Sequence, residues 1–305
     1  MIKNMNIYKY YSHNTHLYYI ILLIIIIIII ILIILILYKT KNKNTENFIN
    51  LNEESILLSK PIENIKTIYV REKINNTEIP LNLFTCWHTS ELPPKMNNTI
   101  NKIKNDNLDF NIYIFNNNNC RNMIEKYFTD DVLTAYDSLN SDAFKADLWR
   151  YCALYLYGGI YQDIKFEPIN NFKYIHLIDN EYFAKDIKES NGGVLNGILI
   201  CKKNNKILEK AIKKIITNVK NKYYGTSPLE PTGPLLLKNF FSEYEIDNLK
   251  LRLTGKGNDI KIVFNDIEIL KMYDGYRNEQ KEYGTKHYND VWEQKKMYKE
   301  KNKSL

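Results

Sequence analysis

Cysteines are few in this sequence, and they lie far apart. The four of them, Cys86, Cys120, Cys152 and Cys201, form no C-x-x-C pair and no dense framework. Structural zinc sites require such close spacings, so the sequence predicts none, and no disulfide can be deduced from it. Cys152 lies in a stretch with helical periodicity, where a cysteine behaves as a small apolar side chain.

An arginine-rich stripe is also missing, although the 305 residues carry a formal net charge of +7. The lysines are scattered among asparagines, whereas a nucleic-acid-binding surface gathers its basic residues on one face. The sequence therefore predicts no nucleic-acid partner. It also contains no Ser/His/Asp set and no phosphate-binding glycine loop, since "NGGVLNG" (191–197) is better explained as a turn that enters a strand.

One long hydrophobic run stands near the N-terminus. Residues 20–37 are all aliphatic, and as a helix they would measure about 27 Å, close to the hydrocarbon thickness of a bilayer. Tyrosines flank the run, and "YKTKNKN" follows it where a signal peptide would have a small-residue cleavage site. We therefore expect an N-terminal tail (1–16) and a single-pass transmembrane anchor (17–38).

The charges around this run do not decide its orientation, because lysines stand on both sides of it. Three Asn-x-Ser/Thr sequons, at Asn75, Asn97 and Asn302, would suit a lumenal domain in a secretory-type compartment. Both orientations stay open at this point.

The rest of the chain divides into a polar stem (39–77), a folded domain (78–293) and a polar C-terminal tail (294–305). Strands are expected at 81–87, 109–116, 159–163 and 193–201, and helices at 95–105, 120–128, 141–159, 203–220 and 235–242. Strands that alternate with helices in this order indicate an α/β fold whose sheet is covered on both faces.

Charged residues lie on the clearest helix, 141–159, and soon after it. Asp147 and Arg150 are three residues apart, so their side chains leave the helix on one side. Gly158 and Gly159 then allow a tight turn and a close approach to a ligand. The following strand ends at Asp163, and ligands bind beyond strand ends in such sheets. We therefore expect the three charged residues around one pocket.

The segment "KADLWRYCALYLYGGIYQDIKFEPI" (145–169) resembles the signature of glycosyltransferases with a DXD sugar-binding region, which is approximately "SDxxRxxxLxxxGGxYxDxD". The resemblance is to glycosyltransferase family 32, which includes the initiating α-1,6-mannosyltransferases of yeast and related polysaccharide-type and viral enzymes. The matching positions are Asp147, Arg150, Leu154, Gly158, Gly159, Tyr161 and Asp163. Ala146 replaces the usual serine, and Lys165 replaces the last aspartate.

Weaker matches extend the resemblance over about residues 79–293. They are "IPLNLFTCWHTSELPP" with Trp87, "LNGILICKKNNKIL" with Asn196, "TGPLLL" (232–237), and "HYNDVW", whose His287 and Trp292 match a terminal pair. The resemblance implies a GT-A-like mixed sheet flanked by helices. It also implies a nucleotide-sugar donor linked to UDP or GDP, a glycan or glycoprotein acceptor, and hexose transfer with retention.

The resemblance also assigns roles to residues, and it implies a divalent cation, Mn²⁺, beside the diphosphate leaving group, whose developing negative charge needs a counterion. The catalytic candidates are Asp163, Asp147 and Arg150. The donor-binding candidates are Trp87, Asp147, Arg150, Gly158, Gly159, Tyr161, Lys165, Asn196 and Trp292. The metal candidates are Asp163 and His287.

Lys165 puts the metal in doubt, because a DxD pair offers two carboxylates and a lysine repels a cation. Asp163 could bind the metal with help from His287 or Asp290, or the Lys165 ammonium could neutralise the diphosphate itself. Lys165 could also point away, but residues i and i+2 of a strand face the same side. We expect an active hexosyltransferase with altered metal use. The alternatives are a catalytically silent, membrane-anchored sugar- or nucleotide-binding protein with a degenerate DxK site, and a membrane-tethered structural protein whose motif is accidental.

Overall fold

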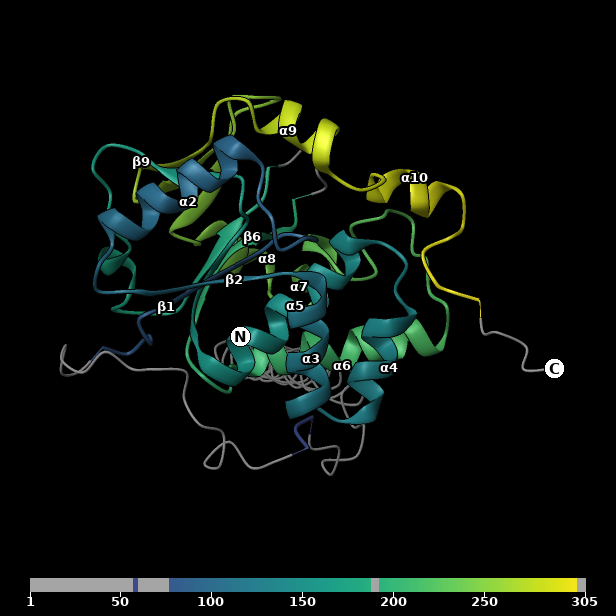
Figure 1. Cartoon of the computed structure of the whole chain (residues 1–305). Helices are drawn as coiled ribbons and strands as arrows, with labels where there is room; N and C mark the ends of the chain where they lie inside the picture. Colours follow the sequence, from purple (N-terminus) through teal and green to yellow (C-terminus); the bar gives the residue numbers. More distant parts are fainter. Residues whose placement is uncertain (1–56, 60–76, 188–191, 301–305) are drawn as a thin grey trace, which may run out of the picture. The chain divides into compact units, whose positions relative to one another are not determined.

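The computed structural model describes residues 57–59, 77–187 and 192–300 (Figure 1). The expected N-terminal tail, the expected transmembrane anchor and most of the expected stem lie outside the described residues. None of the described helices is both long and apolar enough to cross a membrane. The described residues, which begin at Leu57, form one compact unit.

A nine-stranded mixed sheet runs through this unit, in the order β2-β1-β3-β6-β5-β7-β8-β9-β4. The strands are β1 (Asn82–Cys86), β2 (Asn111–Phe115), β3 (Gly159–Gln162), β4 (Phe166–Pro168), β5 (Tyr182–Lys185), β6 (Val194–Cys201), β7 (Leu251–Thr254), β8 (Lys261–Phe264) and β9 (Ile267–Met272). β1 pairs in parallel with β2 and β3, and β5 with β7, while the other pairs are antiparallel. The expected mixed α/β fold is confirmed.

The connection from β3 to β4 shows that the sheet curls. Only residues 163–165 separate the two strands in sequence, yet β3 is third in the order and β4 is last. The far edge of the sheet must therefore return towards its middle. The three connecting residues sit where the two parts meet.

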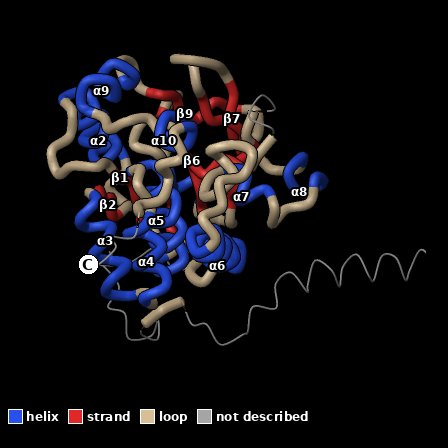
Figure 2. The backbone as a smooth tube through the Cα atoms, turned by 90° about the vertical axis from the view of Figure 1, so that its right-hand side faces the viewer, coloured by secondary structure: helices blue, strands red, loops and turns tan. Residues whose placement is uncertain are grey.

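Helices cover both faces of the sheet (Figures 1 and 2). They are α2 (Pro94–Asp106), α3 (Asn117–Tyr127), α4 (Asp130–Ser138), α5 (Asp142–Tyr157), α6 (Lys206–Lys220), α7 (Pro234–Lys238), α8 (Glu243–Asp247), α9 (Tyr276–Tyr283) and α10 (Tyr288–Glu293), with a 3₁₀ turn at Tyr174–Leu177. The side with α3, α4, α5 and α6 holds one hydrophobic cluster, and the side with α2 holds the other. Both faces of the sheet are thus buried.

Helix α5 is the structural centre of the first cluster. Ser141 precedes its first turn without a side-chain cap hydrogen bond, and Gly158, at φ 62°, ends it. Phe144, Leu148 and Cys152 are buried on one side of the helix, and Trp149 and Tyr151 on other sides are buried too. The helix is therefore enclosed by its neighbours almost all the way round.

The structure extends the folded unit beyond both expected boundaries. Leu57 and Leu58, in the expected stem, are buried against α3 and α4, and Leu58 forms a bridge with Phe128. Met297 and Tyr298, in the expected polar tail, are buried as well, and Tyr298 bridges to Leu139. Short apolar pairs inside polar runs have no periodicity, so the sequence pattern did not reveal them.

Candidate active site

Backbone hydrogen bonds fix the three-residue turn after β3. The Asp163 amide donates to the Gly197 carbonyl of β6 at 2.8 Å, and the Tyr273 amide, just beyond β9, donates to the Lys165 carbonyl at 2.9 Å. The turn is thus held on both sides by the curled sheet. Asp163 and Lys165 line the same cavity, so the idea that Lys165 points away is wrong.

Both carboxylate oxygens of Asp163 are bonded to the protein. Oδ1 accepts hydrogen bonds from Arg150 Nη1 at 3.1 Å and from the Tyr161 hydroxyl at 2.9 Å. Oδ2 lies 2.6 Å from Lys165 Nζ. Burial opposes ionisation of Asp163, but Lys165 and then Arg150 outweigh it and hold the pKa of the carboxyl below its ordinary value.

Arg150 joins Asp163 to Asp147, and its side chain is only 7% exposed. Nη2 lies 3.2 Å from Asp147 Oδ1, Nη1 also donates to the Asn196 carbonyl at 2.7 Å, and Nε donates to the Ala146 carbonyl at 3.1 Å. The guanidinium carbon lies 4.4 Å from the centre of the Tyr161 ring. Most of its donors are therefore used within the protein.

Asp147 is held in the same way. Its Oδ1 accepts from Asn196 Nδ2 at 2.8 Å and its Oδ2 from the Thr232 hydroxyl at 2.7 Å. Burial raises the pKa of Asp147, although Arg150 and the hydrogen bond from Thr232 oppose this. Asp147, Arg150, Asp163 and Lys165, which we call the central cluster, thus form one network of two carboxylates and two cations.

The central cluster lines a cavity of about 490 Å³. Eight of the residues expected in the site lie in its wall, namely Trp87, Asp147, Arg150, Tyr161, Asp163, Lys165, Asn196 and His287. Among the described residues, the buried indole nitrogen of Trp87 has no hydrogen-bond partner. Cys86 also lines the cavity, but burial raises the pKa of its thiol to about 11, which keeps it protonated at neutral pH.

Three expected donor-binding residues do not line this cavity. A side-chain carbon on Gly158 would lie 2.8 Å from the Lys203 backbone nitrogen, and one on Gly159 would lie 2.4 Å from the Asn82 carbonyl oxygen. The two glycines thus allow close backbone packing rather than an approach to a ligand. The Trp292 indole donates to the Tyr224 carbonyl at 2.7 Å, because it leaves α10 on a different side from His287.

Several residues of the site were not expected from the sequence. Thr232 and Tyr151 position Asp147 and Asn196, and Gly197 leaves room for the Asp163 carboxylate, whose Oδ2 would lie 2.8 Å from an added side-chain carbon. Asp186 and Arg277 also line the cavity. The segments that the resemblance covers contain Tyr151, Gly197 and Thr232, but nothing in one sequence assigned these residues to the site. Nothing in it singled out Asp186 or Arg277 either.

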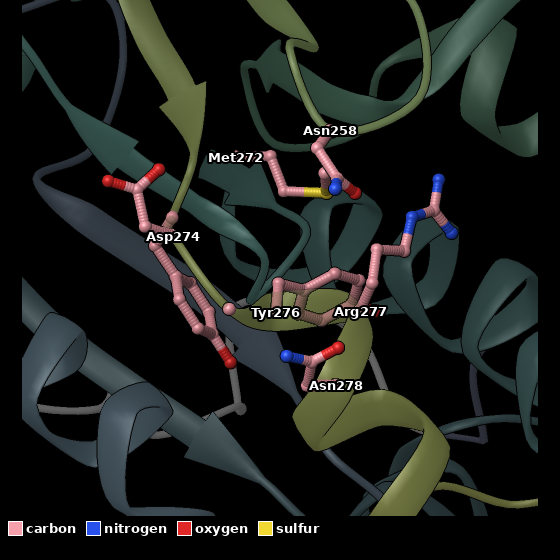
Figure 3. Close-up of a pocket in the computed structure, with 8 residues that line it drawn as sticks. Asn258, Met272, Asp274, Tyr276, Arg277 and Asn278 are labelled. Carbon is pink, nitrogen blue, oxygen red and sulfur yellow. The ribbon is translucent and has the colours of Figure 1, made fainter.

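A second cavity, of about 250 Å³, lies at the start of α9 (Figure 3). Its wall includes Asn258, Met272 and Asp274, and Arg277 belongs to the walls of both cavities. Figure 3 shows the Arg277 and Asp274 side chains on opposite sides of this cavity. Arg277 therefore lies between the two cavities and adds positive charge to the wall of the larger one.

The described residues do not fit a divalent cation at Asp163. A metal site built from side chains requires several ligands around one point, and the described part of the chain contains no group of three His, Cys, Asp or Glu side chains that could hold a metal ion. Asp163 Oδ2 already faces an ammonium, and His287 Nδ1 accepts a hydrogen bond from the Asn289 amide at 3.3 Å. The Asp163–His287 metal pair expected from the sequence therefore has no third ligand among these residues.

The charge state of Asp163 leads to a prediction about pH. Because its pKa is lowered by folding, its ion pairs stabilise the protein above the unfolded-state pKa of about 3.9 and lose this effect as the pH falls through the folded-state value. We expect Asp163→Asn to be less stable than the wild type at pH 7, and the difference to shrink below about pH 4. Denaturant unfolding at several pH values measures this, and a difference that stays constant down to pH 3 would contradict it.

Parts of the sequence are similar to a known protein family and to a viral protein. Residues 93–184 match the family described as glycosyltransferase sugar-binding region containing DXD motif. The chain is also similar to an uncharacterized glycosyltransferase of Acanthamoeba polyphaga mimivirus, with 25% identity over 142 residues, or 47% of this chain and 55% of the relative. The matched part thus spans about half the length of that relative. A DXD region of this type generally implies divalent cation binding.

Two solved structures are similar to parts of the chain. The PaToxG glycosyltransferase shares 19% identity at a TM-score of 0.41, covering 52% of this chain and 67% of its own. The ligand-free glycosyltransferase domain of the YGT toxin shares 13% identity at a TM-score of 0.35, covering 51% and 66%. The chain is thus similar to glycosyltransferases over part of its length.

Proposed function

We propose that this chain transfers a hexose from a UDP- or GDP-linked sugar to a hydroxyl group of a glycan or glycoprotein, with retention at the anomeric carbon. The central cluster carries the proposal, because residues at the spacing of a glycosyltransferase signature are hydrogen-bonded together in one cavity. The cavity volume of about 490 Å³ lies within the range of small-ligand sites.

The hydrogen bonds support different roles for the residues of the cluster. Asp147 and Arg150 are positioning residues, since their polar atoms are largely used within the protein. Asp163 and Lys165 are more exposed, at 22% and 24% of their side chains, and are suited to touch the donor. Trp87, at the cavity wall, is suited to stack on the nucleotide base.

The ion pairs of the Asp163 carboxylate favour one alternative function. This is a membrane-anchored protein that binds a nucleotide or sugar and no longer catalyses transfer. In this alternative the ion pair between Asp163 and Lys165 is the remnant of a degenerate metal site. The two functions differ in one observable. The alternative predicts nucleotide binding without release of nucleoside diphosphate from any donor.

Nucleotide release by the full chain in detergent tests the proposal. With a panel of UDP- and GDP-sugars and mixed glycan acceptors, we expect release with at least one donor, and a loss of about a hundredfold or more in Asp163→Ala. Asp131→Ala is the matched control, because Asp131 pairs with Lys220 on the surface and does not line the cavity. No release together with no thermal shift by any nucleotide would refute the proposal.

Membrane anchoring through residues 17–38 is part of the proposal, on the evidence of the aliphatic run. The full chain is expected to stay with membranes after carbonate extraction, and a chain that lacks residues 1–44 is expected to be released. Extraction of the full chain into the carbonate supernatant would contradict the anchor.

A further inference from the structure

The position of Lys165 Nζ is the first observation beyond the proposed function. It lies 2.6 Å from Asp163 Oδ2. A divalent cation bound to a carboxylate oxygen lies at a similar distance, roughly 2.0–2.6 Å. Asp163 Oδ1 is taken by Arg150 and Tyr161. A cation at the same place beside Oδ2 would have to displace the ammonium, so the lysine stands where the metal of a DxD pair would stand.

The charges of the central cluster lead to the same conclusion. Two carboxylates face two cations, so the cluster is balanced without a metal. An aspartate in place of Lys165 would make the net charge of the central cluster more negative by two. One bound divalent cation would compensate for this difference. The lysine therefore supplies locally what a metal supplies beside a DxD pair.

The ammonium also has donors left for a ligand. It carries three N–H donors, and among the described residues its one hydrogen bond goes to Asp163 Oδ2. The side chain lines the cavity, is 24% exposed and lies 5.1 Å from the centre of the Phe166 ring. Asp163 and the turn thus hold the ammonium at the cavity wall, where its two remaining N–H donors are left for acceptors of a ligand.

We propose that Lys165 is a built-in cation that contacts the diphosphate of the donor and makes transfer independent of a divalent metal. This rests on the proposed function. The bond between the anomeric carbon and the diphosphate oxygen breaks with its electron pair on that oxygen, where Lys165 stabilises the charge. The acceptor hydroxyl oxygen forms the new bond to the anomeric carbon. Its proton leaves with the nucleoside diphosphate.

Calorimetric titration of the full chain with UDP and GDP, in EDTA and in Mn²⁺, tests the binding part. We expect the wild type to bind its nucleotide equally well in both buffers. In Lys165→Ala, binding in EDTA is expected to weaken about ten- to a hundredfold, the effect of losing a charge-assisted hydrogen bond. Lys213→Ala is the matched control: Lys213 is 25% exposed, pairs with Glu209 at 2.9 Å and does not line the cavity.

The Lys165→Asp variant is expected to gain a dependence on a divalent metal. The variant restores the DxD spacing, so we expect nucleotide binding and nucleotide release to become dependent on Mn²⁺. Electron paramagnetic resonance of free Mn²⁺ in the presence of the nucleotide is expected to show uptake by Lys165→Asp and none by the wild type.

Two results would overturn the inference, and they differ from each other. If the wild type binds and turns over its donor only with Mn²⁺, the inference fails and the proposed function stands. If neither nucleotide binds in either buffer and no donor releases nucleoside diphosphate, the proposed function fails and the inference falls with it.

Discussion

Replacing Arg150 by alanine is expected to lower the free energy of unfolding by about 3–5 kcal/mol, because the substitution leaves two carboxylates in the interior without their shared cation. Arg150 is 7% exposed and contacts both Asp147 and Asp163. Its donors also satisfy the carbonyl groups of Ala146 and Asn196. Urea unfolding followed by tryptophan fluorescence measures the change.

Arg121→Ala is the control for this experiment. Arg121 also contacts two carboxylates, with hydrogen bonds of 2.9 Å to both oxygens of Asp137 and a distance of 3.2 Å to Glu125, but it is 39% exposed. Exposed ion pairs contribute about 0–1 kcal/mol. Equal losses in the two variants would show that burial of the central cluster has no energetic consequence.

The double variant Arg150→Ala/Asp163→Asn separates the loss of the ion pair from the cost of a buried carboxylate that has lost its partner. Asp163→Asn removes one of the two carboxylates that would lose Arg150 as a partner. We therefore expect the double variant to lose less stability than the sum of the two single variants. Additive losses would mean that the two side chains are not coupled across their 3.1 Å contact.

The core of the site was predictable because its signals are local. Ser141 and Gly158 bound one helix, Asp147 and Arg150 lie three apart on it, and the next strand leads to Asp163 within five residues of Gly158. Such short spacings largely determine which side chains meet. Asp163 and Lys165 do lie together, but in a turn that two neighbouring strands hold, since β3 ends one residue before Asp163.

The far part of the sheet was not predicted, although one signal was present. Asn265 and Asp266 both have positive φ, at 46° and 66°, and form the two-residue connection between β8 and β9. This is the backbone of the tight turns that join hairpin strands and that favour Asn and Asp. The return of β9 to β4 could not be foreseen, because that pairing joins residues about 100 positions apart and no local pattern encodes it.

The side chains that complete the site depend on such distant pairings. Thr232 reaches Asp147 across 85 positions of sequence, and Asn196 reaches it across 49. The family resemblance selected Asn196, but it also selected Trp292, whose indole bonds to the Tyr224 carbonyl instead. A match in residue type therefore identified the part of the chain, and only the fold determined which side chains face the cavity.

Replacing Gly159 by alanine is expected to destabilise the protein by about 3 kcal/mol or more, the combined effect of backbone strain and overpacking. Gly159 has φ 121°, a region that other residues rarely adopt, and an added side-chain carbon would lie 2.4 Å from the Asn82 carbonyl oxygen. That oxygen belongs to β1, which pairs with β3 and leads to Trp87. The loss is therefore expected in both stability and nucleotide binding.

Gly257→Ala separates the two causes. Gly257 also has positive φ, at 59°, but no atom lies within 4 Å of an added side-chain carbon, so only backbone strain of about 1–2 kcal/mol applies. Thermal unfolding of both variants, with UDP and GDP titrations on each, measures the difference. We expect Gly159→Ala to be the less stable of the two and the only one that binds nucleotide more weakly. Equal stability would mean that β1 and β3 can separate without cost, and the close packing that holds Trp87 and Asp163 at one cavity would lose its explanation.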